Sequence, residues 1–208
     1  MRKSREVAAE TRKRIVRAAA RKFREQGIVA TGLNDLMKAA GLTRGGFYKH
    51  FESKDQLVAE ACAAAVDAAI ASWGMEAQPT INAAVAAYLS TRHRDDPASG
   101  CPLAAIGSEL SRTDKKTREA ATEGFKRLVA VLAGKSKTQN ARRRALVAVA
   151  TMIGAVTMSR VVTDLGLSAE ILSAAEKVWR RIRCDGSSAA FSKISRPGQS
   201  VKASRPLF

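Results

Sequence analysis

The sequence predicts an all-α fold, and three observations support this prediction. Alanine, which costs least in a helix, is abundant, and aromatic residues make up only 5% of the chain. Apolar residues recur at intervals of three and four along most of the chain, which is the spacing of one helix face. No segment alternates apolar and polar residues as a half-buried strand does. The 208 residues suffice for one large or two small domains with a true core.

Four helices joined by tight turns are predicted within the first 70 residues. Ser and Thr side chains accept hydrogen bonds from the free N–H groups at a helix start, so Thr31, Thr43 and Ser53 are predicted N-caps. Glycine ends helices because it adopts the left-handed backbone without strain, and Gly27 and Gly41 are placed to do so. The predicted helices span 10–26, 31–40, 43–50 and 53–70.

Five further helices are predicted beyond Trp73. Asp114 and Ser168 are predicted N-caps, and Pro79 is predicted to begin the first of the five. The predicted helices span 79–89, 101–110, 114–132, 141–162 and 168–183, with a loop over 95–100 and a polar link over 134–140. Residues 185–208 are rich in Ser, Gly, Pro and Lys without periodicity, so we expect a disordered or loosely docked tail.

The charge distribution favours a polyanionic partner. The formal net charge is +17, and residues 1–60 hold 14 Lys and Arg against 7 Asp and Glu. The positive excess in this segment is therefore about twice as dense as in residues 61–184. Nucleic acid is the first partner expected from such a segment and an acidic membrane surface the second. For the dispersed charges of the middle region, a purely solubilising role is the alternative.

The cysteines and apolar runs exclude other classes. Cys62, Cys101 and Cys184 are odd in number, widely spaced and form no CxxC pair, so neither a disulfide framework nor a zinc site is expected. We expect no cofactor or metal. The basic N-terminus lacks the apolar stretch of a secretory signal, and the most apolar run, 145–158, is short for a membrane span. These observations predict a cytoplasmic protein with no membrane partner.

The residues around Gly41 fit a helix-turn-helix. This motif needs a bracing helix, a turn with a glycine, and a second helix that enters the major groove of DNA. Leu36, Ala40, Leu42 and Phe47 supply the internal apolar contacts. The segment after Thr43 then carries the polar and glycine residues that suit contact with phosphates and base edges.

From Thr11 to Leu57 the sequence resembles the TetR/AcrR family of regulators. The pattern consists of Arg14-Ile15, Ala18-Ala19, Phe23, Gly27, Thr31, Leu36, Ala40-Gly41-Leu42-Thr43, Gly45, Phe47-Tyr48, His50-Phe51, Lys54 and Leu57. The chain departs from the family at Gly32-Leu33, where a β-branched or Ser-type residue usually enters the second helix. The resemblance implies a helix-turn-helix DNA-binding domain over 1–52 and a helical regulatory and dimerisation domain over 53–184, followed by the tail.

The resemblance also implies particular DNA contacts. Phosphate contacts are expected from Thr31, Thr43, Tyr48, His50 and Lys54. Arg44 and Lys49 are candidates for reading base edges, since the Arg fork pairs with guanine. Gly45 and Gly46 are poor helix formers, and we expect them to let the backbone approach DNA closely. Phe47 and Phe51 are expected in the core rather than stacked on bases.

In the resembled family the larger domain binds a small molecule and forms a homodimer. Helices 141–162 and 168–183 are expected to pair with their twins, with Ala148, Gly154 and Ala155 permitting close approach. A dimer reads two half-sites of a palindromic double-stranded operator. The unknown effector is expected in a pocket, although ordinary core packing is the alternative for its candidate lining. That lining comprises Trp73, Tyr88, Leu89, Ile106, Leu110, Phe125 and Met152.

Cys101, in the sequence Gly100-Cys101-Pro102, is a candidate sensor of electrophiles or oxidants. A similar segment occurs in a subgroup of TetR-like regulators, some of which sense such compounds through a nearby cysteine. A helix N-terminus favours a thiolate, and Arg92 and Arg94 lie close in the sequence. The alternative is a small buried residue at a helix start.

These residues fit two functions and disfavour a third. The first is a dimeric repressor released from its operator by a small molecule or by an electrophile or oxidant. The alternative is a sequence-tolerant architectural DNA-binding protein, which the +17 charge also fits. An enzyme is not expected, because the chain has only two histidines and no GxSxG, HExxH or P-loop motif.

Overall fold

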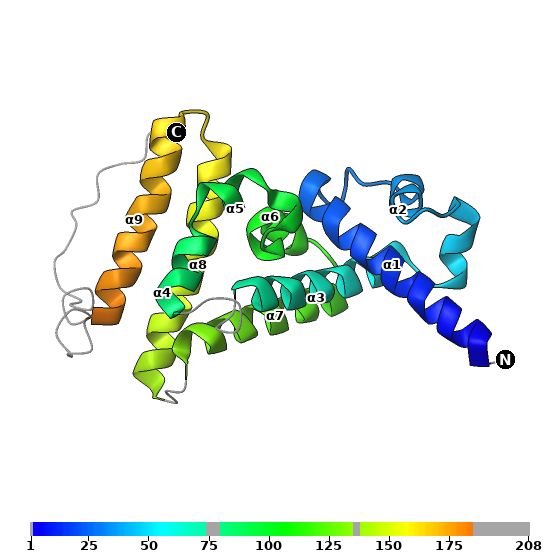
Figure 1. The fold of residues 1–208 in the computed structure, drawn as a ribbon, viewed down its shortest axis with the longest axis horizontal. Coiled ribbons are helices and arrows are strands. Elements are labelled where there is room, and N and C mark those ends of the chain that lie inside the picture. Colours follow the sequence, from blue (N-terminus) through cyan, green and yellow to red (C-terminus); the bar gives the residue numbers. More distant parts are fainter. Residues whose placement is uncertain (1, 74–79, 135–137, 185–208) are drawn as a thin grey trace, which may run out of the picture.

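The computed structural model describes residues 2–73, 80–134 and 138–184, and within them it contains helices and no strand (Figure 1). The helices of the first half are α1 (Arg2–Gln26), α2 (Leu33–Ala39), the 3-10 helix η1 (Arg44–Lys49) and α3 (Lys54–Trp73). They are followed by α4 (Ile81–Tyr88), α5 (Thr91–Asp95), the 3-10 helix η2 (Pro97–Ser99), α6 (Pro102–Leu110), α7 (Lys115–Ala133), α8 (Gln139–Val161) and α9 (Leu165–Cys184). The all-α prediction is confirmed.

Two buried clusters form the cores of an elongated molecule, with α1, α2 and η1 at one end and α8 and α9 at the other (Figure 1). The first cluster unites α1, α2, η1 and the first half of α3 around Phe23, Leu36 and Phe47. The second unites α4, α7, α8 and α9 around Val85, Val129 and Val156. Helix α3 packs along both α1 and α7, and therefore joins the two ends.

The first core extends beyond the predicted domain boundary between residues 52 and 53. Leu57, Val58 and Ala61 of α3 belong to it, and so do Ile106 and Leu110 of α6. The boundary itself stays a prediction, but the packing shows that the helix-turn-helix end is completed by residues on both sides of it. The predicted tail over 185–208 lies outside the described residues.

Two predicted N-caps, Ser53 and Asp114, are confirmed, and two are wrong. Thr43 occupies the N-cap position of η1, but its side chain makes no capping hydrogen bond. The Ser53 hydroxyl accepts a hydrogen bond from the Gln56 N–H at 3.1 Å, and the Asp114 carboxylate accepts one from the Thr117 N–H at 2.9 Å. Thr31 does not cap α2, because the chain enters this helix one residue later, at Gly32. Ser168 does not cap α9, which begins at Leu165.

The start of α9 is explained by Asp164. Its carboxylate accepts a hydrogen bond from the Leu167 N–H at 3.0 Å, and its carbonyl accepts one from the Ser168 N–H at 2.9 Å. The Ser168 hydroxyl is buried and donates to the Ser159 carbonyl at 2.7 Å. This side chain therefore ties α9 to α8 instead of capping a helix.

Other boundaries differ from the predictions for similar local reasons. Helix α1 begins eight residues before the predicted start, at Arg2. The Thr80 and Thr138 hydroxyls cap α4 and α8. Helix α4 therefore begins at Ile81, whereas the predicted start, Pro79, lies outside the described residues. Helix α8 begins at Gln139, before the predicted start at residue 141. The predicted loop over 95–100 contains η2, preceded by the short helix α5.

Helix α8 is long and apolar enough, by length and composition, to cross a membrane. From the sequence alone, the apolar run 145–158 is predicted to be too short for this. Its side chains Val149, Met152 and Val156 are buried in the second core, between α7 and α9.

Candidate nucleic-acid interface and effector pocket

The recognition segment η1 is a short 3-10 turn anchored by one buried ring. Phe47 is fully buried and stacks on Phe51 with ring centroids 5.6 Å apart. The backbone N–H groups of Gly46 and His50 donate to the carbonyls of Thr43 and Phe47, which is the i to i+3 pattern of a 3-10 helix. Two adjacent glycines in so short a helix explain the absence of α-helical turns.

The predicted DNA-contacting side chains lie on the outer face of this segment. Thr43, Arg44, Tyr48 and Lys49 are exposed, and the Tyr48 side chain retains 69% of its accessible surface. The Tyr48 ring leans edge-on against Phe47 at 5.1 Å, so the buried anchor also orients an exposed ring. His50 is half-buried at the end of the segment.

The glycines around the turn differ in their backbone conformation and in the space around them. Gly41 has a φ of +67°, which confirms the predicted turn between the two helices. A side chain at Gly46 would meet the Met37 side chain at 3.6 Å, whereas one at Gly45 would meet nothing within 4 Å. Internal packing therefore does not require glycine at position 45, and its close approach to DNA stays a prediction.

Thr31 and Lys54 are engaged within the protein. The Thr31 side chain is fully buried, and its hydroxyl donates to the Gly27 carbonyl at 2.5 Å. This hydroxyl therefore faces inward rather than toward a phosphate, and we leave Thr31 out of the proposed interface. The Lys54 ammonium donates to the Ile28 carbonyl at 2.7 Å while remaining half-exposed. Its phosphate contact stays a prediction.

Sequence reasoning missed Arg12, which holds the end of the recognition segment. From α1 its guanidinium donates to the His50 carbonyl at 3.3 Å and lies 4.5 Å from the centre of the Phe51 ring. It also forms a two-pronged ion pair with Glu60 of α3, one contact being 2.6 Å long. This pairing raises the pKa of Arg12. One side chain thus fixes η1 against both α1 and α3.

Replacing Arg12 with methionine is expected to weaken DNA binding about tenfold, which corresponds to about 1.4 kcal/mol. The variant loses the contact that fixes His50 and leaves Glu60 without its partner. Arg17→Met is the matched control, because Arg17 lies on the same helix and makes only an exposed pair with Glu10. Equal operator affinities for the two variants in a fluorescence-anisotropy titration would show that Arg12 does not position η1.

Polar contacts tie the turn between α1 and α2 to α6. The Glu109 carboxylate accepts hydrogen bonds from the Ile28 N–H at 2.8 Å and the Val29 N–H at 3.0 Å. Gly27, with a φ of +88°, lies so close that a side chain there would meet Glu109 at 2.7 Å. Arg24 donates to the Ala98 carbonyl at 2.8 Å. The helix-turn-helix end is therefore joined to α6 and η2.

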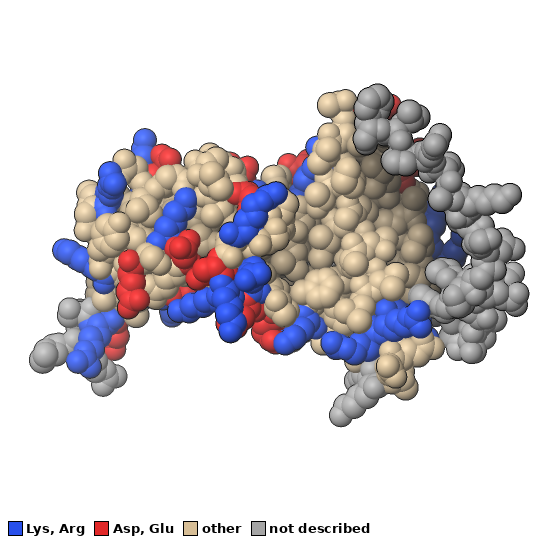
Figure 2. Space-filling view, turned by 180° about the vertical axis from the view of Figure 1, so that it is seen from behind, with Lys and Arg blue, Asp and Glu red and all other residues tan. Residues whose placement is uncertain are grey.

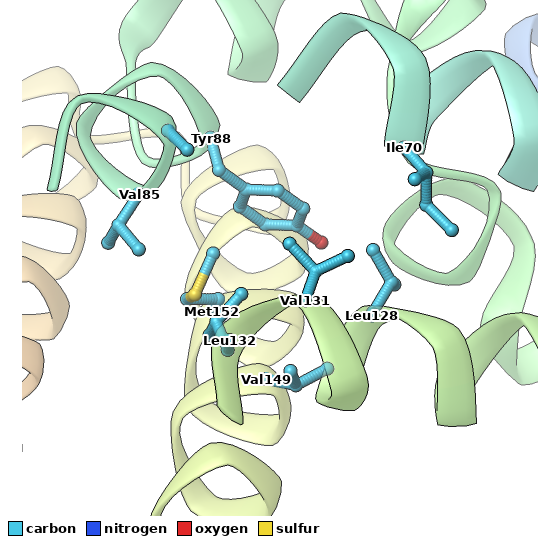
Figure 3. A pocket seen from close by; sticks show the side chains of 9 residues that line it. Ile70, Val85, Tyr88, Leu128, Val131, Leu132, Val149 and Met152 are labelled. Carbon is cyan, nitrogen blue, oxygen red and sulfur yellow. The ribbon is translucent and has the colours of Figure 1, made fainter. Parts of the chain in front are cut away.

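The second core contains a small apolar cavity (Figure 3). It is lined by Ile70, Ala84, Val85, Tyr88, Leu128, Val131, Leu132, Val149 and Met152. Of the predicted lining, Tyr88 and Met152 are present. Leu89, Ile106 and Leu110 belong to the cores but not to this lining, and Phe125 is half-buried against the second core. The Trp73 side chain lies outside the described residues.

Cys101 is the N-cap residue of α6, as its sequence position indicates, but its thiol is fully buried. Burial raises the pKa of this thiol, and this outweighs the opposing effects of Arg160, the Tyr88 hydroxyl and the helix start. The prediction of a thiolate favoured by the helix dipole is therefore wrong for this conformation. The sensor role stays a prediction that needs exposure of Cys101.

His93 explains the Gly100-Cys101 segment. Its Nε2 accepts a hydrogen bond from the Cys101 N–H at 3.0 Å, which assigns the proton to Nδ1, 2.6 Å from the Tyr88 carbonyl. A side chain at Gly100 would meet the His93 ring at 2.7 Å. Burial, with Arg160 nearby, lowers the pKa of His93 to about 4. The neutral imidazole thus locks the start of α6 to the end of α4.

Arg160 completes this cluster from α8. It donates to the His93 carbonyl at 2.6 Å and to the Arg94 carbonyl at 2.9 Å. Among the residues that the structure describes, no three His, Cys, Asp or Glu side chains gather as metal ligands.

Comparison with known proteins agrees with this architecture. Residues 15–61 match the family model of bacterial regulatory proteins of the tetR family. Residues 77–167 match the model of the C-terminal domain of LmrA/YxaF-like transcriptional regulators. The chain belongs to the TetR family. Members of this family are transcriptional regulators, so both the recognition segment and the second helical domain have counterparts in it.

Curated TetR-type relatives match mainly the helix-turn-helix end. The HTH-type transcriptional regulator AcrR of Shigella flexneri is 46% identical over 59 residues, 28% of this chain and 27% of its own length. The chain thus matches about a quarter of the length of such relatives. An uncharacterised HTH-type transcriptional regulator of Mycobacterium tuberculosis is 29% identical over 169 residues, 74% of this chain and 86% of its own length.

Solved structures share the fold over most of this chain. A TetR transcriptional regulator from Chloroflexus aurantiacus has a TM-score of 0.68 and 28% identity, covering 88% of this chain and 97% of its own. The reduced form of Escherichia coli NemR has a TM-score of 0.66 and 20% identity, covering 83% and 96%. At that identity the second likeness concerns the fold alone.

Proposed function

We propose that this TetR-family chain is a cytoplasmic homodimeric repressor that binds a palindromic operator through two copies of η1. The observation that carries the proposal is the exposed polar face of Thr43, Arg44, Tyr48 and Lys49 on a fully buried Phe47 anchor. Such a rigid segment presents hydrogen-bonding groups to a groove without ordering them anew on binding. A repressor role is also favoured by a relative from Escherichia coli, described as a probable acrEF/envCD operon repressor, which is 43% identical over 53 residues.

An apolar stripe on α8 and α9 supports the homodimer. Val147, Gly154, Met158 and Val161 lie on one face of α8 at spacings of seven, four and three, and all are exposed. On α9, Leu165, Leu167 and Val178 are also exposed. Figure 2 shows a broad area without charged side chains over this end of the molecule. Exposed apolar patches of this kind mark protein interfaces, and a second copy offers the same two helices.

Of the three small residues predicted to permit close approach, Gly154 lies on this stripe. It is exposed, and a side chain added there would meet nothing within 4 Å. Ala148 and Ala155 are buried inside the second core and serve the packing within one chain. The proposed dimer contact therefore centres on Gly154 rather than on all three.

For the effector, the geometry supports a small molecule held in the apolar cavity over direct modification of Cys101. Cys101 is itself part of the second core, and its thiol is fully buried, which raises its pKa and keeps it protonated. Mass spectrometry after mild N-ethylmaleimide treatment tests the alternative. Modification of Cys101 in the folded protein, accompanied by loss of DNA binding, would favour the electrophile sensor.

Selection of bound duplexes from random DNA tests the proposed function. A dimeric regulator is expected to enrich one palindrome, with half-sites about one helical turn apart or a multiple of it. The architectural alternative, which the +17 charge fits, predicts no enriched sequence and equal affinity for all duplexes. The absence of any enriched sequence would reject the repressor.

Arg44→Ala is expected to reduce operator selectivity. If Arg44 pairs with a base edge, its loss weakens binding to the selected site by about 1–3 kcal/mol and leaves binding to unrelated DNA nearly unchanged. Lys38→Ala is the control, because Lys38 is exposed on α2, outside the recognition segment. A uniform loss of affinity for all sequences would instead assign Arg44 to a phosphate.

A further inference from the structure

The start of α8 and the end of α9 together form a strongly basic end of the molecule. The two helices pack against each other and run in opposite directions, so these two helix ends lie together, far from η1 (Figure 1). We call this end the basic pole. It comprises Arg142, Arg143 and Arg144 of α8 and Lys177, Arg180 and Arg181 of α9. Arg144 is half-buried and the other five side chains are exposed.

The charge of the basic pole is not neutralised within the chain. Residues 124–159 contain seven Lys and Arg and no Asp or Glu. In residues 171–184 the one carboxylate is that of Glu176, which pairs with Arg180 at 2.7 Å. Among the residues that the structure describes, Arg142, Arg144 and Arg181 form no ion pair. Figure 2 shows Lys and Arg side chains, without Asp or Glu, along the lower edge of this end.

Helix stability does not account for the arginines of α8. The N-terminal end of a helix carries a partial positive charge, which favours anions and disfavours cations. Arg142 lies in the first turn of α8, Arg143 and Arg144 follow it directly, and this turn has no acidic residue. The same effect favours Arg180 and Arg181 at the end of α9, so only the α8 arginines are placed against it. Their position indicates a use outside the helix itself.

DNA is the polyanion that fits the basic pole best. The planar fork of arginine pairs with phosphate through two hydrogen bonds, and a duplex presents phosphates at close intervals along both strands. A chain that holds DNA through η1 also keeps further DNA at a high effective concentration. A membrane surface would need exposed apolar side chains beside the cations, and Val147 and Val178 belong instead to the proposed dimer stripe.

We propose that the basic pole binds the phosphate backbone of a second DNA segment without reading its sequence. The chain then contacts DNA at both ends, through η1 at one and through the α8 and α9 arginines at the other. This proposal goes beyond the repressor function and does not depend on operator selectivity. Because the contact consists of phosphate pairs, it weakens as the salt concentration rises.

Duplex binding by a chain with a disabled η1 tests the proposal. Arg44→Ala, Tyr48→Ala and Lys49→Ala together remove the polar face of η1. A fluorescence-anisotropy titration with a duplex of unrelated sequence is expected to show remaining, salt-sensitive binding. The absence of any remaining binding at low salt overturns the proposal.

Removing charges from the basic pole of this disabled chain tests the place of binding. Arg142→Gln, Arg144→Gln and Arg181→Gln together are expected to lower duplex affinity at least tenfold at low salt. The slope of log K against log salt concentration is expected to fall by about 2 to 3, since each lost phosphate contact removes about 0.9. Unchanged affinity or an unchanged slope overturns the proposal.

The matched control is Arg92→Gln, Lys116→Gln and Arg118→Gln, which removes the same charge from exposed positions on α5 and α7. It is expected to change duplex affinity less than threefold. Equal losses in the two triple variants would show that only the overall charge matters, and the proposal fails.

Urea denaturation separates a binding role from a structural one. The basic-pole variant is expected to be at least as stable as its parent, because the start of α8 loses cations that the helix disfavours. If the triple variant does not fold, Lys177→Gln with Arg181→Gln, both exposed on α9, replaces it. This pair is expected to lower duplex affinity at least threefold, and no loss overturns the proposal.

Co-sedimentation with vesicles of phosphatidylserine and phosphatidylcholine tests the other partner. If the basic-pole substitutions abolish vesicle binding but leave duplex binding unchanged, the surface faces a membrane and the proposal is rejected. The repressor is tested separately, by operator selection with an intact η1. Failure of that selection rejects the repressor and leaves the basic pole, whereas a successful selection without a basic-pole effect does the reverse.

Discussion

Replacing Val161 and Leu165 together with glutamate is expected to separate the dimer and to weaken operator binding by on the order of 10²-fold or more. Both side chains are exposed apolar groups at the junction of α8 and α9, with 65% and 74% of their surface accessible. In the proposed dimer they are covered by the partner copy, and four carboxylates at that contact repel one another without counter-charge. A single protomer then holds only one half-site.

Sedimentation velocity and operator titration measure the two effects. Ala130→Glu is the control, since Ala130 is exposed on α7, away from the apolar stripe. It is expected to leave both the sedimentation coefficient and the operator affinity unchanged. If the double variant sediments like the original chain, Val161 and Leu165 do not form a dimer contact.

Lowering the pH from 7 to 4 is expected to reduce the free energy of unfolding by about 3 kcal/mol through His93 alone. The pKa of His93 falls from 6.5 to about 4 on folding, because burial of the ring disfavours its charged form and outweighs the opposing hydrogen bond to the Tyr88 carbonyl. The unfolded chain takes up a proton below pH 6.5, and the folded chain does so only near pH 4. The stability is therefore fully present above pH 6.5 and is lost progressively as the pH falls toward 4.

Urea denaturation at several pH values, in the original chain and in His93→Gln, measures this effect. Glutamine can donate to the Tyr88 carbonyl and accept from the Cys101 N–H, but it does not titrate. The difference between the two chains isolates His93 from Asp96, whose pKa is also lowered and which titrates below this window. His50→Gln is the control, since His50 is half-buried outside the cluster. Equal pH dependence of the free energy of unfolding in the original chain and in His93→Gln would contradict a buried His93 that stays neutral in the folded chain.

The helix-turn-helix is predictable from sequence because its signals are local. Apolar spacing places Leu36 and Phe47 inside, and the turn needs a glycine at position 41, where the structure has a left-handed backbone. The outward direction of Arg44 and Lys49 follows from the burial of Phe47. These features depend on residues within about ten positions of one another.

The two incorrectly predicted N-caps show that local sequence signals do not determine which residue caps a helix. Thr31 and Ser168 have the chemistry of N-caps, but each hydroxyl finds a carbonyl partner in the fold instead. The helix starts are instead formed by Gly32, the residue after Thr31, and by Asp164, four residues before Ser168. Sequence alone does not reveal which of two nearby residues has its side chain free for capping, because tertiary packing decides it.

Long-range contacts account for the remaining differences. Arg12 meets Glu60 across 48 positions, and Glu109 meets Ile28 across 81. Cys101 is buried beside Tyr88 of α4 and His93 of the short helix α5. Its proximity in sequence to Arg92 and Arg94 instead predicts a positively charged environment that favours the thiolate. The cavity lining draws on four helices, so periodicity identifies its residues only as core.

The central claim is that the face of η1 recognises a specific operator. The most direct measurement is the ratio of Kd values for the selected palindrome and for a scrambled duplex of the same composition, at about physiological salt. The account predicts a preference for the palindrome of on the order of 10³-fold or more. Equal affinity for the two duplexes would contradict it.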